Sequence, residues 1–292
     1  MPTNQLLDPV LEWYAANRRD LPWREPDATA WGVLVSEVML QQTPVSRVLP
    51  VRQDWLRRWP VPAALAAEPA GEAVRAWGRL GYPRRALRLH EAAQVCVGSF
   101  AGQVPRTIAE LRRLPGVGDY TAAAVASFAF RDRHVVLDTN VRRVLARAVG
   151  GTAYEPPGAV TTSERRRAEE LLPVEPEVAA TWGVAVMELG ALVCRARTPA
   201  CAGCPIEAAC AWRGAGSPDW DGPARRGQTY AGTDRQVRGM LLAVLRASPG
   251  PVSEDMLAAA WDEATQRDRA LAGLVKDGLV ERTSEGTYAL PG

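Results

Sequence analysis

The stretch Leu114-Pro115-Gly116-Val117-Gly118-Asp119-Tyr120-Thr121 decides the fold. It lies between an expected helix over residues 107–113 and another over residues 120–130. The two glycines permit backbone conformations that other residues avoid, and the second helix presents the positive end of its dipole, so outward-facing amides can bind a phosphate. The pattern favours a helix-hairpin-helix in which Gly116, Val117 and Gly118 hold a DNA phosphate; a plain connection between two helices is the simpler alternative.

Short amphipathic helices broken by Pro and Gly make up the rest of residues 5–212. No sustained alternation of apolar and polar residues argues for a sheet there, so we expect a mainly all-α fold. The expected helices cover residues 6–16, 31–42, 45–59, 71–78, 84–100, 107–113, 120–130, 141–148, 163–172 and 178–193.

A second, smaller domain is expected after a surface linker. Residues 213–234 are rich in Gly, Pro, Asp and Arg and show no periodicity, which is typical of a linker. Residues 235–292 then predict helices over 235–246, 253–260 and 266–276, followed by strands over 278–282 and 287–290, a pattern typical of a winged helix. This segment has 7 basic and 8 acidic residues, a net charge of −1, so packing or protein contacts are as plausible for it as DNA.

The charged residues are unusual in type rather than in balance. The net charge is only +2, which does not by itself indicate nucleic acid, but 34 of the 35 basic residues are arginine and Lys276 is the single lysine. Genomic base composition explains this bias as well as phosphate contacts do. The chain begins without a basic stretch followed by an apolar run, and its longest apolar segment is too short to span a bilayer, so we expect a cytoplasmic monomer without membrane contact.

Four of the five cysteines form one cluster. Cys194, Cys201, Cys204 and Cys210 are spaced Cys-x6-Cys-x2-Cys-x5-Cys, and Cys96 lies apart from them. Four thiolates bind zinc or a 4Fe-4S cluster, and a single Cys-x2-Cys pair flanked by lone cysteines favours the iron-sulfur cluster. Arg195 and Arg197 lie between the first two cysteines, where they either reach a phosphate backbone or stay solvated.

Asp138 follows an apolar run and precedes an expected helix. An aspartate in this place is most simply a helix N-cap. Its position downstream of the hairpin, with Asn140 two residues later and able to hold the carboxylate by a hydrogen bond, adds a functional interpretation.

The hairpin, Asp138 and the cysteine spacing together resemble the endonuclease III superfamily. Leu21-Pro22-Trp23-Arg24, Ser36-Glu37-Val38-Met39-Leu40-Gln41-Gln42-Thr43 and Gly81-Tyr82 are similar to signatures of its MutY-type adenine DNA glycosylases, and the similarity covers roughly residues 5–212, about seventy percent of the chain. The resemblance implies a six-helix lobe at about residues 23–131 and an iron-sulfur lobe made of about 5–22 plus 132–212. It also implies a 4Fe-4S cluster and, as partner, double-stranded DNA that contains a mispaired adenine.

The resemblance assigns the chemistry to two carboxyl groups. It implies that Glu37 protonates the adenine, while Asp138 stays ionised and stabilises the positive charge that develops on the sugar. Apolar neighbours around Glu37 would raise its pKa, and its spacing from Gln41 would place both on one helix face. We expect the two carboxyl groups to converge on one nucleotide that has been flipped out of the duplex.

Further residues receive roles by the same resemblance. Trp23, Arg24 and Glu188 would line the adenine pocket, with Glu188 accepting from the exocyclic amine. Gln41, Gln42 and Tyr82 would contact the substrate, with Gln41 and Tyr82 as wedges in the base stack; Tyr120 would form a hydrogen bond near Asp138. The family's usual Gly-Tyr-Tyr reads Gly-Tyr-Pro here, and core packing is the alternative interpretation of Tyr82.

Tyr120 takes the place that a Schiff-base lysine has in members that cut the strand. Because Lys276 is the only lysine of the chain, we expect no lysine-dependent lyase step. Residues 235–290 are too few for the 8-oxoguanine-recognition domain of longer relatives and contain no histidine, which leaves the preference for 8-oxoguanine or guanine open. A mismatch-specific thymine glycosylase and a non-catalytic iron-sulfur DNA-binding protein are the alternatives.

Overall fold

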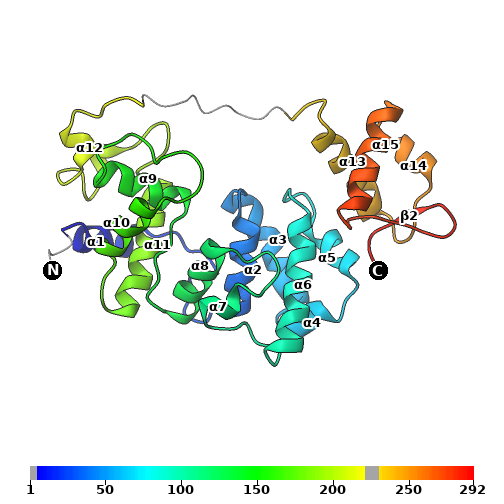
Figure 1. Ribbon diagram of the computed structural model, residues 1–292, viewed down its shortest axis with the longest axis horizontal. Helices are drawn as coiled ribbons and strands as arrows, with labels where there is room; N and C mark the ends of the chain where they lie inside the picture. Colours follow the sequence, from blue (N-terminus) through cyan, green and yellow to red (C-terminus); the bar gives the residue numbers. More distant parts are fainter. Residues whose placement is uncertain (1–4, 221–229) are drawn as a thin grey trace. The chain divides into compact units, whose positions relative to one another are not determined.

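The computed structural model describes residues 5–220 and 230–292, and the part described is mainly helical (Figure 1). The chain divides into two compact units, one made of residues 1–33, 106–108 and 118–224, and the other of residues 34–105, 109–117 and 225–292. The centre of the expected linker, residues 221–229, lies outside the described part.

The first unit is built around one long apolar helix. Its helices are α1 (Leu7–Asn17), α8 (Asp119–Phe130), α9 (Thr139–Ala148), α10 (Thr162–Leu171), α11 (Pro176–Leu192) and α12 (Ala211–Gly214). Helix α11 packs against α1, α8 and α9, and α1 lies beside it in Figure 1 although the two are far apart in sequence. Val10, Val144, Ala185 and Leu189 belong to the shared core, and burial of such side chains is the main stabilising contribution.

Helices α3 to α6 form the greater part of the second unit. They are α3 (Val45–Arg58), α4 (Pro62–Ala66), α5 (Ala70–Trp77) and α6 (Arg84–Ser99), preceded by α2 (Ala30–Leu40) and followed by α7 (Ile108–Leu111). Their core contains three tryptophans: Trp55 lies edge-on to Trp59 with ring centroids 4.7 Å apart, and edge-on to Trp77 at 5.7 Å. Edge-to-face pairs of this kind add to the stabilisation that burial provides.

The C-terminal elements of the second unit are α13 (Asp234–Ala247), α14 (Glu254–Ala258), α15 (Ala264–Lys276), β1 (Glu281–Arg282) and β2 (Tyr288–Ala289). The strands pair antiparallel, with Arg282 opposite Tyr288, and Val252 forms a further antiparallel bridge to Tyr288. These three helices and the hairpin match the expected element order. Both strands are shorter than the sequence pattern predicts, because residues 278–280 and 290 form no ladder in the described structure.

Two arginines fasten the C-terminal elements to α5. Arg75 near the end of α5 donates to the carbonyls of Leu245, Arg246 and Ser248 at the end of α13, and Arg246 donates in return to the Val74 carbonyl at 3.0 Å. Each guanidinium thus satisfies carbonyls that the other helix leaves unpaired at its end. The chain terminus also returns to α5 (Figure 1), where the Gly71 N–H donates to the Pro291 carbonyl at 2.6 Å.

Several expected boundaries were wrong. Helix α2 ends at Leu40 and not at residue 42, because Gln42 takes a left-handed backbone (φ 53°) and Pro44 cannot continue a helix. Helix α7 is shorter than residues 107–113, and α4 and α12 were not expected at all. At four or five residues these helices are too short for a periodic pattern to reveal them.

None of the described helices combines the length and the apolar character that crossing a lipid bilayer requires.

Gly71 tests how the C-terminal elements are held. A Cβ at Gly71 would lie 2.5 Å from the Pro291 carbonyl oxygen and 2.8 Å from the Leu290 Cβ, so we expect Gly71→Ala to push the chain terminus away from α5 and to destabilise the protein by about 1–3 kcal/mol. Gly98→Ala in α6 is the matched control, because its Cβ meets nothing within 4 Å. Chemical unfolding and proteolysis of the C-terminus measure both; equal stability of the two variants would contradict the close packing.

Candidate active site and cysteine loop

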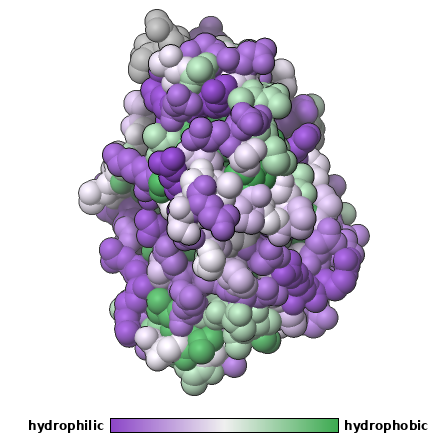
Figure 2. Space-filling model, turned by 90° about the vertical axis from the view of Figure 1, so that its right-hand side faces the viewer, coloured by the Kyte–Doolittle hydropathy of each residue, from purple (hydrophilic) through white to green (hydrophobic). Residues whose placement is uncertain are grey.

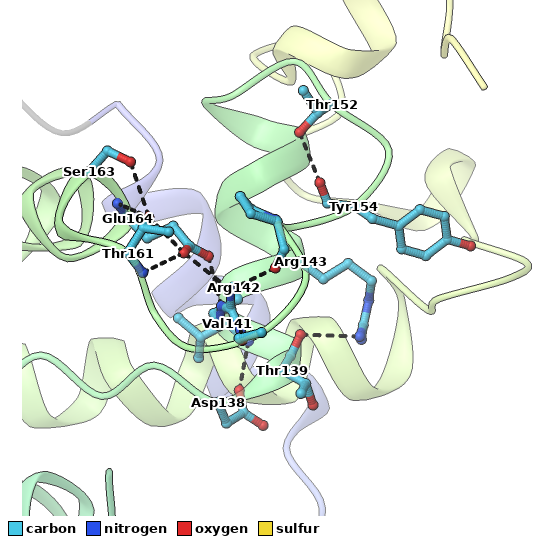
Figure 3. A network of polar contacts seen from close by, with 12 residues as sticks. Asp138, Thr139, Val141, Arg142, Arg143, Thr152, Tyr154, Thr161, Ser163 and Glu164 are labelled. Carbon is cyan, nitrogen blue, oxygen red and sulfur yellow. Dashed lines mark hydrogen bonds and ion pairs between the residues drawn. The ribbon is translucent and has the colours of Figure 1, made fainter. Parts of the chain in front are cut away.

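Asp138 is the N-cap of α9. Its Oδ1 accepts from the Val141 N–H at 2.7 Å (Figure 3), and its Oδ2 accepts from the Asn140 side-chain amide, also at 2.7 Å. Burial raises the pKa of Asp138 above its ordinary value, while these two hydrogen bonds and the Arg143 guanidinium favour the carboxylate. The Asp138 carboxyl group therefore loses its proton most readily when a positive charge in addition to Arg143 lies beside it.

Arg143 connects the Asp138 carboxylate to the cysteine loop, residues 194–210, which carries the four clustered cysteines. The sequence pattern does not reveal this contact. Its guanidinium donates to the Asn140 Oδ1, to the Gly190 carbonyl and to the Cys194 carbonyl, each at 2.7 Å. Asn140 thus has its amide N–H on Asp138 and its amide oxygen on Arg143. The carboxylate is held by a chain of hydrogen bonds that ends at the first cysteine of the cluster.

The four clustered cysteines line one pocket, together with apolar side chains such as Val144, Leu189 and Ile206. Arg147 of α9 donates to the Cys194 Sγ at 3.4 Å, to the Arg195 carbonyl at 2.8 Å and to the Ala196 carbonyl at 2.9 Å. The carbonyls of the loop therefore face α9, while the side chains of Arg195 and Arg197 are exposed. Neither of these two arginines forms an ion pair within residues 5–220 and 230–292.

Two of the four thiols, those of Cys194 and Cys204, are buried enough to favour the protonated form when no metal is bound. Burial raises the pKa of Cys204 to about 11 and also raises that of Cys194. Metal ligation has to displace these protons. In the described part of the chain, no three His, Cys, Asp or Glu side chains converge closely enough to hold a single metal ion.

Glu188 is completely buried in α11 and accepts from two arginines. Arg19 forms a fork with it through Nε at 2.8 Å and Nη2 at 2.6 Å, and Arg24 Nη2 donates at 2.9 Å. Although burial alone would raise it, these partners lower the pKa of Glu188 to about 2, so both oxygens are anionic and occupied. Arg24 also has a buried Nη1 without a hydrogen-bond partner among the described residues, and Trp23 beside it is buried. Arg19 was not expected from the sequence.

Glu37 lies on α2 and is buried, at 5% exposure. The neighbouring Ser36 is also buried and accepts from Arg52 Nε at 2.6 Å. Val38 and Met39, which follow Glu37, belong to the buried core. Glu37 is therefore shielded from water, and the Arg52 guanidinium is held at the neighbouring residue.

Arg85 clamps the two expected wedge segments to each other. Its guanidinium donates to the Gln41 carbonyl at 2.6 Å, to the Gly81 carbonyl at 3.1 Å and to the Thr43 hydroxyl at 3.0 Å. Gln41 lies in the turn directly after α2, and Arg85 also donates to the Val38 and Met39 carbonyls in the last turn of that helix.

Tyr82 is 44% exposed and takes a left-handed backbone with φ 46°, so its interpretation as a core residue was wrong. The following Pro83 is the N-cap of α6. Gln42 is exposed as well.

The hairpin turn needs glycine at one of its two positions. Gly116 has a φ of 81°, and a Cβ there would lie 2.9 Å from the Cβ of Arg88. Gly118 has an ordinary extended backbone (φ −93°, ψ −175°) and open space around its Cα, so the expectation that it needs a special conformation was wrong. Gly118 is the N-cap of α8, Val117 between the glycines is buried, and Tyr120 follows half-buried in the first turn of the helix.

Gly190 lets α9 approach α11 at Asn140. A Cβ there would lie 2.7 Å from the Asn140 Cβ and 2.8 Å from its carbonyl oxygen, so we expect Gly190→Ala to destabilise the protein by about 1–3 kcal/mol and to displace Asn140. Gly183→Ala on the same helix is the matched control, because its Cβ meets only the Phe128 ring at 3.6 Å. Urea unfolding of both variants checks this, and a Gly190→Ala protein as stable as the control would rule out the close approach.

Comparison with known proteins agrees with this arrangement. Residues 35–169 match the model of the HhH-GPD superfamily of base excision DNA repair proteins. The chain is 55% identical over 286 residues to an adenine DNA glycosylase of Mycobacterium tuberculosis, covering 97% of this chain and 92% of the relative. A solved thermostable thymine-DNA glycosylase is similar at a TM-score of 0.65 and 27% identity, covering 72% of this chain and 95% of the other.

An endonuclease III bound covalently to DNA shares the fold at a TM-score of 0.62 and 22% identity, covering 75% of this chain and all of the other. The helical fold expected from the hairpin is therefore confirmed. The chain belongs to the HhH-GPD superfamily of base excision DNA repair proteins and, within it, to the MutY-type adenine DNA glycosylases.

Proposed function

We propose that this protein removes adenine from double-stranded DNA by hydrolysing the N-glycosidic bond, where the adenine is mispaired with 8-oxoguanine or guanine. The observation that carries the proposal is the 55% identity to an adenine DNA glycosylase over nearly the whole of both chains. The 27% identity to a thymine-DNA glycosylase is much lower, which favours adenine over thymine as the base released. We further propose that the enzyme acts as a monomer.

Glu37 is the general acid of the proposed reaction. Adenine is a poor leaving group, and a proton delivered to its N7 makes the departing base neutral. A carboxyl group 5% exposed is protected from water, and general acid catalysis contributes about 10²–10⁴-fold to such reactions. Ser36 and Arg52 support the same turn of α2 through their hydrogen bond.

Asp138 stabilises the sugar as it becomes positively charged, and bonds to it transiently before water completes the hydrolysis. Burial raises its pKa in the free protein, and the developing positive charge restores the preference for the carboxylate. Asn140 holds one of its oxygens, and Tyr120 supplies a further hydrogen bond near it. Tyr120 cannot form an imine and the chain has one lysine, Lys276, so the strand stays intact.

Arg24 and Trp23 line the adenine pocket in this proposal. The unpartnered, buried Nη1 of Arg24 is a donor available to a ring nitrogen of the base. Because both oxygens of Glu188 already accept from arginines, we propose that Glu188 acts through Arg24, which it orients, rather than by accepting from the exocyclic amine.

DNA is held at two anchors and opened at a third site. The exposed backbone at Gly116 and Gly118, with Val117 between them, receives one phosphate, and the exposed Arg195 and Arg197 receive another. Gln41, Gln42 and Tyr82 enter or border the gap that the flipped adenine leaves. The exposure of Tyr82 and the Arg85 clamp on its turn support this role.

Base release from three duplexes tests the function, with adenine opposite 8-oxoguanine, adenine opposite guanine, and thymine opposite guanine. Under single turnover we expect release from both adenine duplexes, and strand cleavage only after alkali. Glu37→Gln and Asp138→Asn should each lower the rate by at least about 10²-fold without loss of DNA binding.

Glu91→Gln and Asp132→Asn are the matched controls, since Glu91 is exposed and Asp132 pairs with Arg106 at 2.6 Å. Faster release of thymine would support the thymine glycosylase instead. Substantial activity in either catalytic variant would refute its role, and cleavage without alkali would refute the intact-strand product.

We propose that Cys194, Cys201, Cys204 and Cys210 hold a 4Fe-4S cluster. The four thiols line one pocket, and their spacing of Cys-x6-Cys-x2-Cys-x5-Cys suits a cluster better than one zinc ion. When bound, the cluster supplies four Fe–S bonds that fasten the loop carrying Arg195 and Arg197.

Metal analysis of the purified protein tests the cluster. We expect about four iron atoms per chain, broad visible absorption, and loss of both in Cys201→Ser and Cys204→Ser. Cys96→Ser is the control, because Cys96 is buried in α6 and does not line the cysteine pocket. Zinc in place of iron would contradict the assignment.

A further inference from the structure

Three exposed or half-exposed side chains form a stack that joins the C-terminal elements to the proposed wedge. The Arg235 guanidinium lies 5.1 Å from the Tyr82 ring centroid and 5.8 Å from that of Tyr230. Tyr82 is 44% and Tyr230 52% exposed, and Arg235 is also exposed. Arg85 adds a second guanidinium 5.4 Å from the Tyr82 ring. Two aromatic rings interleaved with arginines are a common arrangement in surfaces that bind nucleic acid.

Arg235 forms no ion pair with a carboxylate among the described residues. The neighbouring Asp234 is paired with Arg269 through two hydrogen bonds of 2.7 and 2.8 Å. Asp277, the other acid nearby, pairs with Arg84 at 3.4 Å and with Arg238. Within residues 5–220 and 230–292, Arg235 has aromatic neighbours but no carboxylate partner. The net charge of −1 over residues 235–292 therefore says little about this edge of the domain.

The stack is held in place from both sides. On one side, Arg85 and the Trp77 indole N–H bind the Gly81 carbonyl at 3.1 and 2.9 Å, which fixes the turn that carries Tyr82. On the other side, the hydrogen bonds that Arg75 and Arg246 donate to carbonyls of each other's segment fix α13 on α5. Arg235 is thus positioned before any ligand binds, which lowers the entropy cost of binding.

We propose that the C-terminal domain forms part of the DNA-binding surface, with Arg235 donating to a backbone phosphate beside the base pair that Tyr82 enters. This inference rests on the proposed function, which supplies the DNA duplex. In this proposal, Arg235 is also a positioning residue that supports the Tyr82 ring. The Tyr230 ring contacts the same guanidinium and limits its movement.

The surface favours DNA over a protein partner. The face drawn in Figure 2, which looks onto the side of Figure 1 where the C-terminal helices lie, is mostly hydrophilic, with its larger apolar area at the bottom of the view. Broad apolar patches mark many protein interfaces, whereas unpaired arginines with exposed aromatic rings suit a phosphate backbone.

Duplex binding by the full-length protein tests the proposal, using variants Arg235→Ala, Arg235→Lys and Tyr230→Ala. The control is Arg282→Ala, an exposed arginine of the same domain that lies 6.0 Å from the ring of a different tyrosine, Tyr288. Affinity is measured across a range of salt concentrations, both for an adenine–8-oxoguanine duplex and for a fully paired duplex. The fully paired duplex separates failure of this inference from failure of the proposed function, since its binding requires no adenine excision.

We expect Arg235→Ala to weaken binding of both duplexes several-fold and to reduce the slope of log K against log salt by about one. Arg235→Lys should keep the slope but slow adenine release, because an ammonium group cannot stack on Tyr82 as a planar guanidinium does. Tyr230→Ala should weaken binding less than Arg235→Ala, and Arg282→Ala should match the wild type, as should the melting temperatures of all four. Wild-type affinity and slope for Arg235→Ala, or an equal loss in Arg282→Ala, would overturn the proposal.

Discussion

Buried guanidinium groups require several hydrogen-bond acceptors each, and in the first unit this requirement fixes α9. Arg142, Arg143 and Arg147 on this helix are 9%, 7% and 3% exposed. Arg142 pairs with Glu164 (Figure 3) and donates to two loop carbonyls, while Arg143 and Arg147 bind carbonyls around the cysteine loop. Because a buried charge that loses its partners costs several kcal/mol, α9 cannot shift without large losses. Asp138 at its start and the loop beside its end are therefore held by the same helix.

Arginines at helix ends do similar work in the second unit. Arg85 donates to the last carbonyls of α2 and of the turn after it. Arg75 of α5 donates to a carbonyl after the end of α13, and Arg246 of α13 donates in return to a carbonyl of α5. Arg75 and Arg85 each bind three or more carbonyls at once, which a guanidinium with five donors can do and a lysine ammonium does less well. The predominance of arginine over lysine therefore helps to fix the helices, whatever its origin in the genome. Its chemical consequence is the absence of a lysine for a lyase step in the proposed reaction.

Two of the groups proposed to contact DNA, Tyr82 and Arg195, are exposed side chains on backbone that a half-buried or buried arginine fixes. Tyr82 lies on the turn that Arg85 holds, and Arg195 lies on the loop that Arg147 holds. Exposure leaves these side chains accessible, and the buried arginines limit the positions they can take. Such preorganisation lowers the entropy lost on binding and keeps reacting groups in register.

The sequence by itself determined the helical class, most helix positions, the hairpin, the clustered cysteines and the family, since these features depend on local spacing or on contiguous motifs. The N-cap role of Asp138 and its hydrogen bond to Asn140 follow from such spacing too. Only the tertiary structure decided that Gln41 leaves the helix, that Tyr82 is exposed, that Glu188 is occupied by Arg19, and that Arg143 joins Asn140 to Cys194. These outcomes depend on which carbonyls and carboxylates come within reach of an arginine after folding, from partners 44 to 169 residues away along the chain. No periodicity records such distant choices, because a guanidinium accepts any well-placed oxygen.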